Sequence, residues 1–231
     1  MDKQNSFYEG FLFTDADFED NVGVNEETAY SCSDSDLLEN LQKQVTLVGN
    51  YEMPAVEPYN GDLPEHIGRF EKLILAVTYG IAPHFFTDDR NFERIWLKFF
   101  VYARKLKHFV CVIGPDFSLY LDMPYSKKIY NSFRNKLITA LWQKLGIKVI
   151  PNVSWSDGDM DMYLDGFPKN SVIAINSTGL RRDKHSIDVF RRGYKAVLER
   201  LKPVAILRYG CSFDWENKEI SKYYDNSNKI R

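Results

Sequence analysis

Long hydrophobic runs are absent from this 231-residue chain. No apolar stretch approaches the roughly 20 residues that a helix needs to cross a bilayer. The acidic start MDKQNSFYEGFLFTDADFED also lacks the basic beginning and apolar middle of a secretory signal. Both absences predict a protein that has no membrane partner.

Cysteine is scarce as well. Cys32, Cys111 and Cys211 lie far apart and form no C-x-x-C pair, so the pattern of a disulfide framework or a zinc site is missing. The four histidines form no H-E-x-x-H motif, which disfavours a zinc hydrolase. We therefore expect a reducing cytoplasm and no bound metal, and the sequence leaves any cofactor unknown.

Signatures of phosphate binding and acyl transfer are also missing. The patterns G-x-x-x-x-G-K-[ST], G-x-G-x-x-G and G-x-S-x-G do not occur, which removes the usual nucleotide loops and the usual serine hydrolase. The acidic segment NVSWSDGDMD (152–161) lacks the closing Glu and the later glycine of a calcium loop. None of these known motifs therefore indicates an activity for this chain.

Charge is present but unevenly distributed. Residues 1–50 contain eleven acidic and two basic residues, a balance of −9, whereas the other 181 residues hold 21 acidic and 28 basic residues, a balance of +7. We expect residues 1–50 to be an acidic arm that is partly disordered or extended. Such an arm is either a solvated tail, a cover for a basic surface, or a segment that binds a protein partner.

The rest of the chain alternates short apolar runs with helical patterns. We expect residues 51–231 to form a single α/β domain with a C-terminal extension from about residue 212. The expected strands are 72–80, 109–113, 147–155, 171–178 and 204–210, and the expected helices are 89–108, 126–146 and 186–203.

This alternation predicts a mainly parallel sheet of about five strands with helices on both faces. The alternative is an incomplete or irregular β/α barrel. A complete barrel is disfavoured, because it takes about 250 residues.

Ligands of parallel sheets bind outside the carboxyl ends of the strands, and the segment GPDFSLYLDMP (114–124) follows one of these strands. Its carboxylates Asp116 and Asp122 are candidate catalytic groups that could divide acid and base roles or hold a divalent metal. Capping of the turn by Asp116 and of the next helix by Asp122 is the structural alternative. Tyr120 is a candidate for stacking on a ring of the ligand, or it packs under the loop.

Two further strand ends carry polar residues. Asn152 and Trp155 lie in the last part of the expected third strand, and a large ring at the strand end can wall a pocket or stack on a base. The segment NSTGLRRDKH (176–185) precedes a helix and is the best candidate for an anion site, with a solvated basic turn as the alternative. Its candidate ligand-binding residues are Asn176, Ser177, Thr178, Arg181 and Arg182.

Several segments together resemble a known family. The strings IGPDFSLYLDMP, YNSFRNKL, LWQKLGIKVIPNVSW, LDGFPKNSVIAINSTG and LKPVAILRYG resemble the domain of unknown function 4417 family, whose members are similar to proteins of bacteria, bacteriophages and mobile elements. The resemblance covers about residues 55–212, and near DMDMYLDG the chain departs from the family's aromatic-rich pattern. The family has no established activity, so the resemblance implies no reaction.

The resemblance adds two residues to the candidate set. Arg134 and Tyr209 match motif positions of the family, and both join the candidate ligand-binding residues. We expect Arg134, a charged residue on a helix, to pair with Asp116 or Asp122 and to fix the loop that carries them.

Together these observations favour a phage- or mobile-element-associated α/β protein in the cytoplasm of a bacterial host. It would bind a nucleotide or a nucleic acid at the carboxyl ends of its strands, and its aspartates could make it a hydrolase of phosphodiester or glycosidic bonds. The alternative is a non-catalytic protein that uses residues 1–50 to bind a host or phage protein, for example in counter-defence or in the virion.

Overall fold

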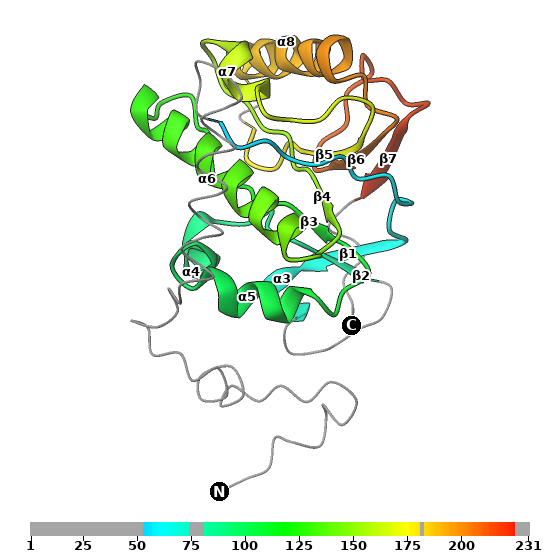
Figure 1. Cartoon of the computed structure of the whole chain (residues 1–231). Helices are drawn as coiled ribbons and strands as arrows, with labels where there is room; N and C mark the ends of the chain where they lie inside the picture. Colours follow the sequence, from blue (N-terminus) through cyan, green and yellow to red (C-terminus); the bar gives the residue numbers. More distant parts are fainter. Residues whose placement is uncertain (1–52, 74–80, 181–182, 225–231) are drawn as a thin grey trace, which may run out of the picture. The chain divides into compact units, whose positions relative to one another are not determined.

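The computed structural model describes residues 53–73, 81–180 and 183–224 (Figure 1). All of them belong to one compact unit, Gln44–Arg231. The acidic arm, most of the expected strand 72–80 and the candidate ligands Arg181 and Arg182 lie outside the described residues.

The described strands are short and parallel. They are β1 (His66–Arg69), β2 (Ile81–His84), β3 (Val112–Ile113), β4 (Val149–Ile150), β5 (Val172–Asn176), β6 (Ala205–Tyr209) and β7 (Ser221–Tyr224). They pair as β1–β2, β3–β4 and β5–β6–β7, and every pair is parallel. The prediction of parallel strands is confirmed, but three small sheets replace the expected sheet of five strands.

The three sheets follow one another in sequence order. A parallel bridge between Asn152 and Ala174 links the segment after β4 to β5, and β2 lies beside β3. Because β3 and β4 each comprise two residues, the backbone ladder is too short to join all strands into one hydrogen-bonded sheet.

The described helices are α3 (Phe70–Leu73), α4 (Arg94–Leu97), α5 (Phe99–Leu106), α6 (Tyr125–Lys144), α7 (Met160–Leu164) and α8 (Lys184–Leu201), with a 3-10 turn η2 (Asp89–Asn91). The predicted helices 126–146 and 186–203 correspond to α6 and α8. The N-cap of α8 is Asp183, whose carboxylate accepts hydrogen bonds from the Ser186 N–H and hydroxyl.

Two expected elements are different in the structure. The expected helix 89–108 is divided into η2, α4 and α5, because Lys98 has φ −118° and ψ 47°, outside the helical region. The expected strand 72–80 begins inside α3, and its remaining residues, 74–80, lie outside the described part. The sequence also gave no signal for the four-residue strands β1, β2 and β7.

Side chains along the strands alternate between two environments. One face of the strands packs against α5, α6 and α8, whose side chains complete two apolar clusters. The other face forms a third cluster, which we call the inward apolar cluster. Each of the seven strands contributes a residue to it, and α5, α6 and α8 contribute none. Among the residues that the structure describes, the long helices therefore cover one face of the strands, and not both faces as the sequence had led us to expect.

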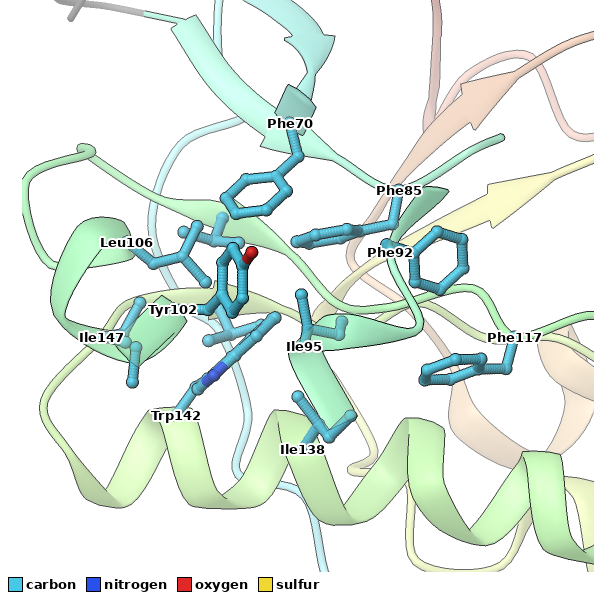
Figure 2. Close-up of a cluster of buried hydrophobic side chains, with 13 residues drawn as sticks. Phe70, Phe85, Phe92, Ile95, Tyr102, Leu106, Phe117, Ile138, Trp142 and Ile147 are labelled. Carbon is cyan, nitrogen blue, oxygen red and sulfur yellow. The ribbon is translucent and has the colours of Figure 1, made fainter. Parts of the chain in front are cut away.

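The largest cluster between strands and helices is aromatic. Trp142 of α6 is fully buried, and its ring lies 5.6 Å from the ring of Phe85, which follows β2. Phe92 and Phe117 extend the same cluster toward the carboxyl ends of the strands, with ring centroids 4.8 Å apart (Figure 2). This packing fixes the loops that follow β2 and β3 against α6.

Gly193 makes room for an aromatic ring on α8. The Trp155 indole stacks on Phe190 at a centroid distance of 5.1 Å, and a Cβ on Gly193 would overlap the indole ring. A glycine inside a helix costs up to about 1 kcal/mol relative to alanine. Close packing of Trp155 explains why this position nevertheless has no side chain.

We expect Gly193→Ala to lower the free energy of unfolding by about 1–3 kcal/mol, because overpacking outweighs the gain in helix propensity. Urea denaturation measures this change. In a Trp155→Ala background the same substitution should be neutral or stabilising. An equal loss in both backgrounds would show that the indole ring is not the cause.

Candidate functional site

Six side chains gather at the carboxyl ends of the strands and form what we call the carboxyl-end layer. Ile67, Ala82, Ile150, Ala174 and Leu207 belong to the inward apolar cluster. Residues two positions further along the same strands face the same side, because side chains alternate along a strand. Five members of the layer lie two positions after these apolar residues, and the sixth is Asp116 from the loop after β3. The layer therefore consists of Arg69, His84, Asp116, Asn152, Asn176 and Tyr209.

Asp116 is at the centre of the hydrogen bonds in this layer. Its Oδ1 accepts from Asn152 Nδ2 at 2.8 Å, and its Oδ2 accepts from Asn176 Nδ2 at 2.7 Å. Asn152 Nδ2 also donates to the Pro115 carbonyl at 3.1 Å, and Asn176 Oδ1 accepts from the Thr178 N–H at 2.7 Å. The carboxylate therefore joins the loops after β3, β4 and β5, and it does not cap its own turn.

The surroundings of Asp116 raise its pKa to about 6. Burial is the largest cause, the two amide donors partly oppose it, and the negative charge of Asp89 adds a small increase. Asp89 itself has a raised pKa because it is partly buried, although it accepts hydrogen bonds from the Ser118 N–H and hydroxyl. The carboxylate that influences Asp116 is thus Asp89, which the sequence patterns did not indicate.

Asp122 and Tyr120 are both exposed. Helix α6 begins at Tyr125 with Pro124 at its N-cap and no side-chain capping bond, so Asp122 is not its cap. Tyr120 is 52% exposed, which does not fit packing under the loop. The segment 114–124 therefore has a partly buried carboxylate near its start and an exposed one near its end.

Asparagines of α6 hold the backbone of this segment. Asn135 accepts from the Phe117 N–H at 2.8 Å and donates to its carbonyl at 3.1 Å, and Asn131 donates to the Ser118 carbonyl at 2.6 Å. Arg134 donates to Asn131 Oδ1 at 3.1 Å. The loop owes its stiffness to these amides as well as to its prolines.

The predicted pairing of Arg134 with Asp116 or Asp122 is wrong. Arg134 forms an ion pair with Glu93 at 2.5 Å, and its guanidinium carbon lies 3.4 Å from the centre of the Phe117 ring. Asp116 is bound by neutral amides instead, and this arrangement leaves its pKa raised. Arg134 still contacts the loop, through Phe117.

The loop after β5 is fixed by Ser177. Its hydroxyl donates to the Cys211 carbonyl at 2.9 Å and lies 3.3 Å from the Tyr209 carbonyl, so it connects the ends of β5 and β6. The N-terminus of α8 is already capped by the Asp183 carboxylate. An anion bound at this helix end would lie beside that carboxylate, and Lys184 is the exposed cation next to it.

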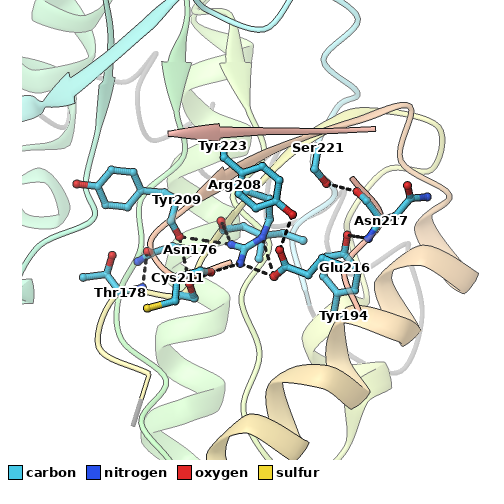
Figure 3. Close-up of polar contacts among 12 residues, drawn as sticks. Asn176, Thr178, Tyr194, Arg208, Tyr209, Cys211, Glu216, Asn217, Ser221 and Tyr223 are labelled. Carbon is cyan, nitrogen blue, oxygen red and sulfur yellow. Dashed lines mark hydrogen bonds and ion pairs between the residues drawn. The ribbon is translucent and has the colours of Figure 1, made fainter. Parts of the chain in front are cut away.

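A buried ion pair fixes the loop after β6 (Figure 3). Arg208 and Glu216 are buried and form a salt bridge at 2.6 Å. Arg208 also donates to the carbonyls of Ile175 and Cys211 at 2.8 and 2.9 Å, and the Tyr223 hydroxyl donates to Glu216 at 2.7 Å. These contacts hold the segment between β6 and β7, so the backbone around Tyr209 has a defined position.

Three candidate residues are buried or partly buried against their neighbours and expose little of their side chains to a ligand. Trp155 is partly buried against Phe190 and α8. Asn152 is buried, and its Oδ1 has no hydrogen-bond partner. Tyr209 is buried, and its ring contacts the rings of His84 and Phe86 at 4.9 Å.

Sequence patterns missed Arg69 and His84. Both end four-residue strands, and in the register of β1 and β2 they are partners of one another. Among the residues that the structure describes, no three His, Cys, Asp or Glu side chains come together as a metal site. Within the same residues, no helix is long and apolar enough to cross a membrane.

Comparison with known proteins identifies the family. The model of the Domain of unknown function (DUF4417) family matches residues 45–226, and the chain belongs to this family. The Gene 1 protein of Mycobacterium phage L5 is 35% identical over 153 residues, which are 64% of this chain and 66% of that protein. The Gene 1 protein of Mycobacterium phage D29 is 35% identical over 162 residues, which are 67% of this chain and 60% of that protein.

The match thus spans less than two thirds of the length of either relative. No solved structure gives a significant match.

The raised pKa of Asp116 predicts a pH-dependent stability. An unfolded aspartate titrates near 3.9, so the contribution of Asp116 is fully present below about pH 4 and is lost as the pH rises through 6. The loss has an upper limit of about 3 kcal/mol, for two pKa units. We expect the unfolding free energy of the wild type, relative to Asp116→Asn, to fall between pH 4 and 7. Carboxyl NMR should give a midpoint near 6, and a midpoint below 4 would contradict the assignment.

Arg134→Ala should loosen residues 114–124, because it removes the guanidinium from the Phe117 ring and the hydrogen bond to Asn131. We expect faster amide hydrogen exchange at Phe117 and Ser118 and faster proteolysis of this segment. Arg104→Ala, at an exposed position on α5, is the control. Equal protection of the segment in both variants would refute a role of Arg134 in holding it.

Proposed function

We propose that this chain is a phage- or mobile-element-associated protein that binds a nucleotide or a nucleic acid at the carboxyl-end layer and acts there as a hydrolase. We also infer that its strands form an incomplete β/α barrel. Their sequence order, and the cover of α5, α6 and α8 on one face only, support this inference. Such a barrel carries its site at the carboxyl ends of the strands.

The environment of Asp116 is the observation that carries the proposal. Its carboxyl is partly buried, is held by two side-chain amides from different strands, and has a pKa of about 6. Near neutral pH such a group exists in both protonation states, as an acid or base catalyst requires. Strongly perturbed carboxylates at strand ends are typical of functional sites.

Asp116 suits the cleavage of a phosphodiester or glycosidic bond. In its protonated form it can donate a proton to the leaving oxygen or nitrogen, and in its charged form it can take a proton from water. Asn152 and Asn176 keep the carboxyl in one orientation throughout, because each amide binds a different oxygen. The exposed Tyr120 ring, in the same loop, supplies a surface on which a base can stack.

The comparisons and the sequence support the ligand class. The relatives that match are proteins of two mycobacteriophages. Arg181, Arg182 and Lys184 follow the end of β5, and arginines near a helix start commonly contact phosphate. A basic segment after β5, an exposed tyrosine in the loop of Asp116 and a titratable carboxyl suit a nucleotide or a nucleic acid better than an apolar ligand.

Asp116→Asn is the direct test, and Asp122→Asn in the same loop is its matched control. We expect Asp116→Asn to reduce nucleotide or nucleic-acid hydrolysis at least 100-fold, whereas Asp122→Asn should retain the wild-type rate. Neither substitution should lower the melting temperature by more than a few degrees. The ligand is first sought by native mass spectrometry and by absorbance at 260 nm of the purified protein.

Equal activity of the two variants, or a wild type that binds no nucleotide and no nucleic acid, would refute the proposal.

The acidic arm supports a second candidate function, the binding of a host or phage protein. Residues 1–50 have a balance of −9, which suits a basic partner. In that case Asp116→Asn and Arg181→Ala would leave binding intact, and deletion of residues 1–48 would abolish it. If the arm instead covers a basic surface, the same deletion should raise the affinity for anions at low salt.

A further inference from the structure

We propose that Arg69 and His84 hold a phosphate group of the ligand, at the side of the carboxyl-end layer formed by β1 and β2. This inference deepens the proposed function and rests on it. It assigns the phosphate to two residues that no sequence motif indicated, in addition to the basic segment after β5.

His84 is fixed as a neutral hydrogen-bond donor. Its side chain is buried, with 3% exposed, and its ring lies 4.9 Å from the rings of Phe86 and Tyr209. The Phe86 N–H donates to Nδ1 at 3.1 Å, so in the neutral imidazole the proton is on Nε2. Burial lowers the pKa of His84 to about 3, and the nearby charge of Arg69 contributes. The neutral imidazole therefore carries an Nε2–H near neutral pH.

Arg69 supplies the charge that the neutral imidazole lacks. It is the last residue of β1, is exposed, and is the register partner of His84. None of the ion pairs among the described residues includes its guanidinium. A guanidinium beside an N–H donor is the combination that binds a phosphate with both charge and direction.

A chain of contacts connects this pair to Asp116. The His84 ring packs on Tyr209, Tyr209 is the register partner of Asn176, and Asn176 donates to Asp116. The donors of β1 and β2 and the carboxyl after β3 thus belong to one layer, and a single ligand can contact both. A cation at one side and an acid at the other would orient a phosphate-bearing ligand toward Asp116.

The experiment measures inorganic phosphate binding to the full chain by calorimetry, and the state of His84 by two-bond ¹H–¹⁵N NMR. We expect Arg69→Gln to weaken phosphate binding at least tenfold, and Arg104→Gln, the same charge change on α5, to leave it unaltered. The wild-type spectrum should show the neutral Nε2–H form of His84 from pH 5 to 8, and phosphate should shift its Nε2 resonance.

Two outcomes would overturn the inference. One is unchanged phosphate affinity of a folded Arg69→Gln protein, and the other is an Nε2 resonance that phosphate does not move. Asp116→Asn separates the two proposals, because it should abolish hydrolysis yet preserve or strengthen phosphate binding, since it removes a negative charge. Loss of phosphate binding in Arg69→Gln with full hydrolysis in Asp116→Asn would sustain the phosphate site and refute the proposed hydrolase.

Discussion

The bonds of the Asp116 carboxylate to Asn152 and Asn176 are the interaction on which the rest of the site depends. They join loops that follow three different strands, and they do so with amides that carry no charge. A lysine or arginine in their place would have lowered the pKa of Asp116. Neutral donors fix its position and leave burial as the dominant influence, so the same contacts that organise the loops also leave a carboxyl that titrates near neutral pH.

The one-sided cover of the helices explains why this layer exists. Side chains on one face of the strands are buried by α5, α6 and α8, whereas those on the other face pack against one another in a separate cluster. On this second face, the side chains change from aliphatic to polar toward the carboxyl ends of the strands. Ala82 is followed on the same face by His84, and Ala174 by Asn176. The buried Arg208–Glu216 pair, on the helix side of β6, stabilises the loop behind Tyr209 without entering this layer.

Sequence patterns predicted the strong elements and missed the weak ones. The helices α6 and α8 and the strands β5 and β6 have long periodic or β-branched apolar signals, so they were predicted correctly. The strands β1, β2 and β7 have four residues each, and their alternation is too short to recognise. Arg69 and His84 were therefore not among the candidate residues, whereas Asp116, Asn152, Asn176 and Tyr209 stood at the ends of predicted or family-matched strands.

The sequence by itself determined the class of the fold and the family, because periodicity and motif order are properties of the chain. Tertiary structure alone decided which polar residues meet. Asp116 pairs with two amides and Arg134 with Glu93, since these contacts join residues 36, 60 and 41 positions apart. Burial, which sets the pKa values of Asp116 and His84, depends on all the neighbours of a side chain in space, and local sequence does not specify them.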